Sequence, residues 1–354
     1  SHPPRVAIVQ LTSTSDKDAN FFVCKACVEE AAARGASLVA FPECFAFVGD
    51  GPSHTVYAGA SSLASPQFTR YRALAARYGV WLSLGGFHER NVDDRHRIRN
   101  AHVIVDPTGS VKSVYHKAHL FDVDLPSQRI AESAFTVAGN KLTVLDLPRV
   151  GPVGLATCYD LRFPAMFEAL RAAEAKVLLV PSAFTVPTGR AHWEVLLRAR
   201  AIENQCYVLA PAQVGIHNPK RHTWGQAMIV DPWGEVMAAC PSYDEIAALH
   251  EHMLEGETSA LSSSRRAPRR HSTTAHASEH AEIAFVSVDF SDMKHAHSSE
   301  HGAASRSGDA HESYFARACV AVANLDFAAQ ERVRAAMPVW GHRRPDMYAA
   351  PVER

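Results

Sequence analysis

The chain has 354 residues and 47% hydrophobic content, so it can bury the core of one large domain or two smaller ones. Its 36 basic and 37 acidic side chains give a formal net charge of -1, which argues against nucleic acid or an anionic membrane as a partner. Apolar runs such as residues 176–181 are far shorter than the roughly 20 residues that span a bilayer, and no signal peptide is apparent. The first residue is not methionine, which leaves room for a short targeting segment before Ser1.

Strand and helix patterns alternate along the first part of the chain and again from residue 150. We predict strands at 5–11, 37–41, 80–84, 150–157, 176–180 and 207–210. We predict helices at 16–34, 66–78, 159–170 and 191–203, the first two closed by Gly35 and Gly79. This alternation is typical of a layered α/β protein.

Two similar segments, at 100–112 and 225–237, each contain the sequence Asp-Pro-x-Gly. Asp at the first position, Pro at the second and Gly at the fourth are the preferences of a type I turn, so we predict two hairpins. Their likeness suggests a domain with two halves, each a sheet with its own helices. Two sheets packed face to face, with helices outside, would bury both sets of strands.

The composition changes between about residues 242 and 313, where Ser, Ala and His dominate around a strand-like stretch at 282–289. We predict a flexible insertion within a single domain that spans 1–354. The insertion holds nine of the 20 histidines, but it lacks companion cysteines or carboxylates at metal-ligand spacing. We interpret it as a solvated loop rather than a metal site. Beyond it we predict a strand at 317–325, a helix to about 336 and a basic tail.

The 7 cysteines are an odd number and thinly spread, which indicates a reducing compartment, the cytoplasm or alternatively the mitochondrion. Cys24 and Cys27 have the spacing of a redox or metal pair, but they fall within the helical run 16–34. Because positions three apart share a helix face, we predict that both thiols pack in the core. We expect no metal and no cofactor.

Three strand-like runs end in a reactive side chain, namely Glu43, Lys117 and Cys158. Ligands in layered α/β proteins gather beyond strand ends, so one shared site is reasonable. Burial would raise the pKa of Glu43 toward the range of a general base. At a strand-to-helix junction, helix N–H groups and the helix dipole would favour a thiolate at Cys158. Taken singly, the three residues could instead be a solvated carboxylate, a surface lysine and an inert buried thiol.

Together the three residues and their flanking sequences resemble the carbon-nitrogen hydrolase, or nitrilase, superfamily. The likeness lies in the segments 41–43, 116–120, 158–164, 181–184, 192–207 and 230–234, and it covers nearly the whole chain apart from the insertion. It implies a four-layer α-β-β-α sandwich and usually a homodimer or larger homo-oligomer. The insertion before the last strand, and Trp340 with Gly341 ahead of the tail, depart from the usual pattern.

The resemblance also implies roles for individual residues. Cys158 would attack a substrate carbonyl and form a thioester, with Glu43 as general base and acid. Lys117 and the backbone N–H of Tyr159 would form the oxyanion hole. Glu132 matches a further glutamate of the family, which would orient Lys117 and Glu43.

Segments 81–90 and 342–348 resemble the branch of the superfamily that hydrolyses deaminated glutathione in metabolite repair. This small-molecule amide has an α-keto acid head, and its hydrolysis yields 2-oxoglutarate and cysteinylglycine. Arg162, four positions after Cys158, could grip the carboxylate in bidentate fashion, or it could be a structural partner of Asp160.

Two alternatives to this function stay open. The omega-amidases, which act on 2-oxoglutaramate, share most of the same motifs and would need the same arginine in a smaller pocket. A protein of another class could keep the fold and act mainly as an interaction partner, with the insertion as its binding arm. The presence of all three catalytic residue types argues against this second alternative.

Overall fold

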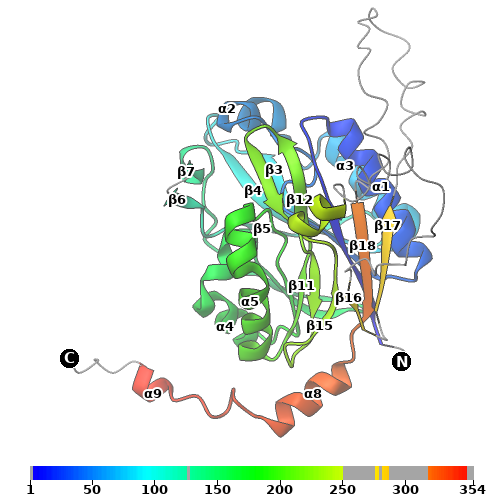
Figure 1. Ribbon diagram of the computed structural model, residues 1–354, viewed down its shortest axis with the longest axis vertical. Coiled ribbons are helices and arrows are strands. Elements are labelled where there is room, and N and C mark those ends of the chain that lie inside the picture. Colours follow the sequence, from blue (N-terminus) through cyan, green and yellow to red (C-terminus); the bar gives the residue numbers. More distant parts are fainter. Residues whose placement is uncertain (1–2, 126–127, 250–275, 279–280, 287–317, 349–354) are drawn as a thin grey trace, which may run out of the picture.

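The computed structural model describes residues 3–125, 128–249, 276–278, 281–286 and 318–348. Within these residues, nine strands form one sheet and seven form another, and the helices lie on the outer faces (Figure 1). Helices α1 (Lys17–Ala33) and α3 (Pro66–Tyr78) cover the first sheet, and α4 (Pro164–Ala172) and α5 (Val186–Asn204) cover the second. The predicted four-layer α-β-β-α sandwich is confirmed.

The first sheet is built around four parallel strands, with antiparallel strands on both sides. Its main path runs β13 (Arg221–Trp224), β12 (Ala212–Asn218), β1 (Arg5–Leu11), β2 (Leu38–Phe41), β3 (Trp81–Arg90), β4 (Ile98–Val105) and β5 (Val111–His116). Strand β18 (Ala318–Asn324) lies antiparallel to β1 and carries β17 (Ala281–Val286) on its other side.

The second sheet repeats the plan of the first, with parallel strands followed by an antiparallel hairpin. Its order is β16 (His276–Ala277), β15 (Val236–Ala239), β14 (Met228–Val230), β11 (Tyr207–Ala210), β10 (Val177–Leu179), β9 (Gly151–Leu155) and β8 (Val144–Leu147). The hairpins β4–β5 and β14–β15 are the two segments predicted from Asp-Pro-x-Gly. In each turn the Gly N–H donates to the Asp carbonyl, at 2.9 Å for Gly109 and 3.0 Å for Gly234.

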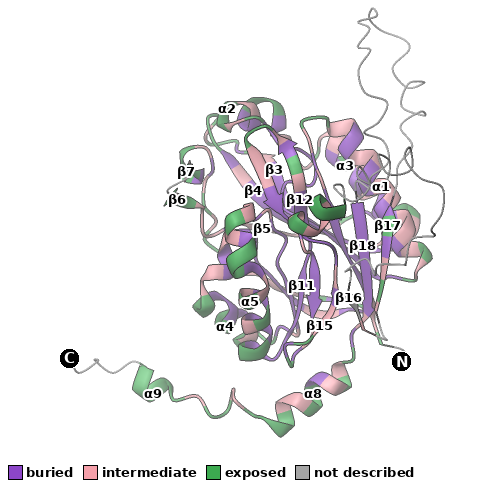
Figure 2. Cartoon of the chain, viewed as in Figure 1, coloured by how far each residue is buried: buried purple, intermediate pink, exposed green. Residues whose placement is uncertain are grey.

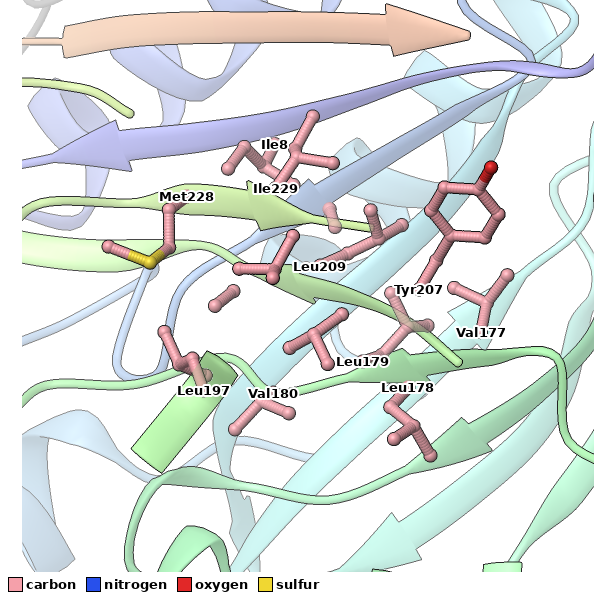
Figure 3. Close-up of a cluster of buried hydrophobic side chains, with 14 of the residues drawn as sticks. Ile8, Val177, Leu178, Leu179, Val180, Leu197, Tyr207, Leu209, Met228 and Ile229 are labelled. Atoms are coloured by element: carbon pink, nitrogen blue, oxygen red, sulfur yellow. The ribbon is translucent and has the colours of Figure 1, made fainter. Parts of the chain in front are cut away.

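The core has two parts because strand side chains alternate between the two faces of a sheet. On β1, Val6 and Ile8 point toward the second sheet, whereas Ala7 and Val9 pack under α1 and α3. Figure 3 shows Ile8 in the cluster that the two sheets share. The strands at the centre are buried and the outward helix faces are exposed (Figure 2).

Cys24 and Cys27 are both completely buried on α1, which confirms that they pack in the core. The predicted helix at 159–170 is wrong in its first half. A 3-10 helix, η3 (Cys158–Arg162), ends before α4 begins at Pro164. Phe163 between them has φ -112° and ψ 89°, because a residue that precedes proline is pushed out of the helical region.

Several short elements had no sequence prediction. They are α2 (Pro52–His54), the π-helix η1 (Thr55–Gly59), the ribbon β6 (Asp122–Leu125) and β7 (Gln128–Ala131), the 3-10 helix η2 (Glu132–Ala134), and the β12–β13 hairpin.

The predicted insertion at 242–313 lies largely outside the described residues. Strand β17 confirms the strand-like stretch at 282–289, in its first part. Of the nine histidines in the insertion, only His276 is within the described residues. After β18, α8 (Phe327–Ala336) and α9 (Pro345–Tyr348) lead away from the sheets toward the C-terminus (Figure 1). None of the described helices is long and apolar enough to cross a membrane.

Candidate active site

The structure brings Glu43, Lys117, Glu132 and Cys158 together at the ends of four segments. Glu43 follows β2, Lys117 follows β5, Glu132 opens η2 and Cys158 opens η3. All four side chains are buried. Lys117 Nζ lies 3.0 Å from Glu43 Oε1 and 2.8 Å from Glu132 Oε2. The ammonium therefore joins the two carboxylates, which is the arrangement expected for residues that hold one another in place.

Asn100 of β4 is a further member of this cluster. Its Nδ2 donates to Glu43 Oε1 at 2.8 Å and more weakly to Glu132 Oε1 at 3.4 Å. The backbone makes room for Glu43 at Gly86, where an added Cβ would lie 2.6 Å from Glu43 Cγ. Because Gly86 also has a φ of +65°, only glycine fits there without strain. Glu43 is thus fixed by three neighbours from two strands and a loop.

Cys158 occupies a tight turn with a φ of 50°, in the left-handed region that non-glycine residues seldom adopt. Its own N–H donates to the Pro181 carbonyl at 2.9 Å, which anchors the turn to the end of β10. The Glu43 carboxylate and the Ala183 backbone N–H lie near enough to the Cys158 sulfur to shift the pKa of the thiol. The nucleophile and its base are therefore neighbours in the site.

The protonation states differ from those expected from the sequence. Burial raises the pKa of the Cys158 thiol well above 9, and the Glu43 charge adds to this, so the expected thiolate is wrong for the free protein. Burial would also raise the pKa of Glu43, but the Lys117 ammonium and the Cys158 hydrogen bond lower it below 4.5 overall. The expected upward shift of the Glu43 pKa is therefore wrong too.

The Lys117 ammonium is held in its charged form by the same cluster. Burial alone would lower its pKa, but the charges of Glu132 and Glu43 raise it well above 10.5. The free site thus contains a neutral thiol, an ionised carboxylate and a fixed ammonium. This is the arrangement of a nucleophile that a general base activates at the moment of attack.

Asp160, which is completely buried, fixes the Cys158 turn to the strand that carries Lys117. Its Oδ2 accepts from Tyr115 Oη at 2.7 Å and from the Thr157 N–H at 2.8 Å. Its Oδ1 accepts from the His119 N–H at 3.0 Å and lies 2.7 Å from His119 Nδ1. All of these partners belong to the β5 end or to the turn itself, so Asp160 does not pair with Arg162.

Arg162 lies with Cys158 in the lining of a small pocket, whose other residues are Phe121, Tyr159, Ala183, Phe184, Thr185 and Thr188. Its two terminal nitrogens lie 3.3 and 3.2 Å from His192 Nδ1, and its guanidinium lies 5.5 Å from the centre of the Phe184 ring. None of the described carboxylates lies within 4.0 Å of it. A ligand carboxylate could therefore take this cation as its partner.

Two residues near the site were missed by the sequence analysis. Asn100 could have been noticed as the polar residue that opens the predicted hairpin at 100–112. Arg221 gave no signal, because the β12–β13 hairpin to which it belongs was not predicted. Its guanidinium lies 3.9 Å from the sulfur of Cys44, the residue after Glu43. In the described part of the chain, no three His, Cys, Asp or Glu side chains are placed to hold a metal ion.

The chain is similar to proteins of known name along most of its length. A family model described as carbon-nitrogen hydrolase matches residues 5–253. A deaminated glutathione amidase from Dictyostelium discoideum is 46% identical over 67% of this chain and 83% of that protein. The amidase of the same name from Homo sapiens is 48% identical over 67% of this chain and 73% of that protein.

Solved structures show the same fold. The NitFhit protein of C. elegans matches with a TM-score of 0.73 at 32% identity, over 99% of this chain and 67% of that chain. An amidase from Nesterenkonia sp., with an acetamide moiety added covalently at its active-site cysteine, matches with a TM-score of 0.58 at 26% identity, over 68% of this chain and 86% of that chain. The chain belongs to the carbon-nitrogen hydrolase family, and it is a hydrolase of amide carbon–nitrogen bonds.

Proposed function

We propose that the chain hydrolyses deaminated glutathione to 2-oxoglutarate and cysteinylglycine, as a metabolite-repair amidase that uses a thioester intermediate. The observation that carries this proposal is the buried cluster of Glu43, Lys117 and Glu132 beside Cys158, at a pocket that Arg162 also lines. The names of the relatives at 46% and 48% identity support the choice of substrate.

In the first half of the reaction, the Cys158 sulfur attacks the amide carbonyl while Glu43 takes the thiol proton. The new C–S bond leaves a negative charge on the carbonyl oxygen, which Lys117 and the Tyr159 N–H stabilise by on the order of 3 kcal/mol per donor. When the C–N bond breaks, Glu43 gives its proton to the departing amine. The acyl group then remains on sulfur as a thioester.

In the second half, Glu43 takes a proton from water as the water oxygen attacks the thioester carbonyl. The C–S bond breaks, the sulfur leaves as a thiolate and receives the proton from Glu43, and the acid is released. Glu132 is a positioning residue for Lys117, to which it is bonded at 2.8 Å. A group that serves as base and then as acid must stay close to the sulfur throughout, and the contacts of Glu43 with Lys117 and Asn100 support this role.

Arg162 binds the carboxylate of the α-keto acid head in this proposal. A planar guanidinium that no described carboxylate engages, in the same pocket as the nucleophile, suits a carboxylate a few bonds from the scissile carbonyl. The omega-amidase alternative uses the same cation with 2-oxoglutaramate, so Arg162 does not separate the two substrates.

The deciding experiment is a comparison of kcat/KM for deaminated glutathione and 2-oxoglutaramate with the purified full chain. We expect deaminated glutathione to be the better substrate. A clear preference for 2-oxoglutaramate would favour the omega-amidase, and inactivity toward both would favour an interaction protein that keeps the fold.

We further propose a homodimer formed through the outer face of α5. Val195, Ile202 and Trp233 are large apolar side chains that are 69%, 45% and 54% exposed on this side of the second sheet. Trp233 belongs to the β14–β15 turn, whose Gly234 packs against Ile202, so two of the three lie close together. An apolar patch of this kind is typical of an interface. Light scattering of wild type and Val195→Asp tests it, since the variant should shift the protein toward monomer.

We also propose that residues 1–354 form one domain with an insertion at about 242–313, and that the protein works in the cytoplasm, with the mitochondrion as the alternative. The pairing of β17 with β18 supports a single domain, because chain from both sides of residues 287–317 contributes to one sheet. The seven cysteines are all free and buried, which supports a reducing compartment. Limited proteolysis that cuts within the proposed insertion at about 242–313 would support the domain proposal, and imaging of a tagged chain would test the compartment.

A further inference from the structure

Arg221 is a partly buried cation beside the catalytic carboxylate that plays no part in the steps above. It opens β13, and one of its terminal nitrogens lies 3.9 Å from the sulfur of Cys44, next to Glu43 in the chain. Strand β12, its hairpin partner, is tied to the same segment, since Gln213 Nε2 donates to the Glu43 carbonyl at 3.0 Å. Arg221 therefore stands at the Glu43 side of the site.

The same strand also borders the wall of the pocket. Thr223 pairs with Thr185, and the Trp224 N–H donates to the Phe184 carbonyl at 2.9 Å. Phe184 and Thr185 line the pocket with Cys158 and Arg162, whereas Arg221 lies outside that lining. The two arginines thus occupy different neighbourhoods, with Arg162 on the pocket side and Arg221 on the side of Glu43.

None of the carboxylates in the described part of the chain forms an ion pair with the Arg221 side chain. Among the acidic residues that the structure describes, none lies within 4.0 Å of its guanidinium, and the Cys44 sulfur is its sole hydrogen-bond contact there. His88, the other neighbour of Cys44, adds no charge at neutral pH, because burial and the nearby Arg221 lower its pKa to about 4. Burial lowers the pKa of Arg221, but nearby anionic groups, Glu43 and Glu132 among them, raise it overall. Because none of the described carboxylates bonds to the guanidinium directly, an anionic ligand can still take that place.

The proposed mechanism indicates which part of the substrate would lie near Arg221. Glu43 delivers a proton to the departing amine, so the leaving group must be on the Glu43 side of the scissile bond. In deaminated glutathione this leaving group is a dipeptide that ends in a carboxylate. Two residues of extended chain span about 7 Å, which carries that carboxylate away from Glu43 and into the reach of a neighbouring long side chain.

We propose that Arg221 binds the terminal carboxylate of the leaving dipeptide and so determines specificity for a peptide-like amide over a primary amide. The inference rests on the proposed function. Arg162 recognises the acyl part, which both candidate substrates share, and Arg221 recognises the leaving group, which only deaminated glutathione has. The competing explanation is that Arg221 merely balances the charges of Glu43 and Glu132 against that of Lys117.

The test measures kcat/KM of wild type and Arg221→Gln for deaminated glutathione and for 2-oxoglutaramate, whose leaving group is ammonia. The loss of a charged hydrogen-bond partner should lower the ratio of the two kcat/KM values about tenfold to a hundredfold, mainly through KM for deaminated glutathione. Lys220→Gln is the matched control, because it removes the same charge from an exposed neighbour in the hairpin. That control should hold the ratio within about twofold.

The possible outcomes separate this inference from the proposed function. Equal losses on both substrates, with a shifted acid limb in the pH profile, would mean that Arg221 acts on the charge of Glu43 and would overturn the inference. An unchanged ratio in a folded variant would overturn it as well. Wild type that fails to hydrolyse deaminated glutathione would overturn the proposed function, and this inference with it.

Discussion

The two kinds of charged group at this site differ in how they are satisfied. Lys117, Glu43 and Glu132 are buried and bonded to one another at 2.8 to 3.0 Å, so their positions are fixed before any substrate arrives. Arg162 and Arg221 have no carboxylate partner among the described residues. The groups proposed to act in catalysis are therefore held in place by other protein side chains. The two arginines proposed to bind substrate would gain a carboxylate partner only when substrate binds.

The largest effect should come from removing the nucleophile at the centre of the bonded cluster. We expect Cys158→Ala to lower kcat by about 10,000-fold or more, because no thioester can form. Mass spectrometry should detect an acyl adduct on Cys158 of wild type during turnover and none on the variant. Cys44→Ala, which removes the neighbouring buried thiol, should retain the adduct. Substantial turnover by Cys158→Ala would contradict the mechanism.

The next largest effect should come from weakening the bonded cluster without removing the nucleophile. Glu132→Gln keeps the shape of the side chain but leaves Lys117 with one ionised partner in place of two. We expect kcat to fall about a hundredfold to a thousandfold, because Lys117 is then less firmly placed at the oxyanion. Glu168→Gln, at the exposed pair with Arg343, serves as the control and should be nearly silent. Thermal unfolding of both variants would separate misplacement from unfolding.

A smaller effect should follow at the recognition groups. Arg162→Lys keeps the charge but replaces a planar fork with a single ammonium, so we expect kcat/KM to fall about tenfold to a hundredfold for both substrates. Arg190→Lys, at the exposed pair with Asp244, is the control. Unchanged kinetics in Arg162→Lys would show that Arg162 does not bind the substrate carboxylate.

The smallest effect concerns pH. Glu43 must be ionised to accept the thiol proton, and its pKa in the folded protein lies below 4.5 because Lys117 and the Cys158 hydrogen bond outweigh burial. We therefore expect kcat/KM to stay flat from about pH 7 down to about pH 5 and to fall only below that range. If kcat/KM instead fell near neutral pH, the pKa of Glu43 in the folded protein would be higher than its contacts with Lys117 and Cys158 imply.

The same shift links acid inactivation to stability. A carboxylate with a depressed pKa stabilises the folded protein above its unfolded pKa, and this contribution is lost as the pH falls through the folded value. Thermal unfolding followed over the same pH range should therefore show stability beginning to fall near the pKa of a glutamate in the unfolded chain, at a higher pH than the acid limb of the rate.

Much of the architecture could be predicted because strand periodicity and turn chemistry are local. Helix α3 has the predicted limits, and both Asp-Pro-x-Gly turns form the expected hairpins. The convergence of Glu43, Lys117 and Cys158 followed from their positions at strand ends. The resemblance to a family, rather than any local pattern, pointed to Glu132, which the structure places against Lys117.

The sequence predictions were wrong or incomplete where contacts between distant residues determine a pKa or the position of a side chain. A thiolate at Cys158 was expected from a helix terminus, but Pro164 divides that helix and burial outweighs the remaining dipole. The pKa of Glu43 was expected to rise from burial alone, because the sequence does not show how close Lys117 lies. Arg221 was missed because the distance that matters joins residues 177 positions apart in the chain.

The pairing of β1 with β18 determines when this protein can fold during its synthesis. Residues Arg5 to Leu11 pair in full register with Asn324 to Ala318, so two neighbouring strands of one sheet come from distant parts of the chain. Until residue 324 has emerged, β1 has an open edge, and the nascent chain must stay unpaired there while more than 300 residues are translated. The family match at 5–253 ends before β18, so a shortened chain cut at that limit would lose the strand beside β1 and expose an apolar edge to other chains.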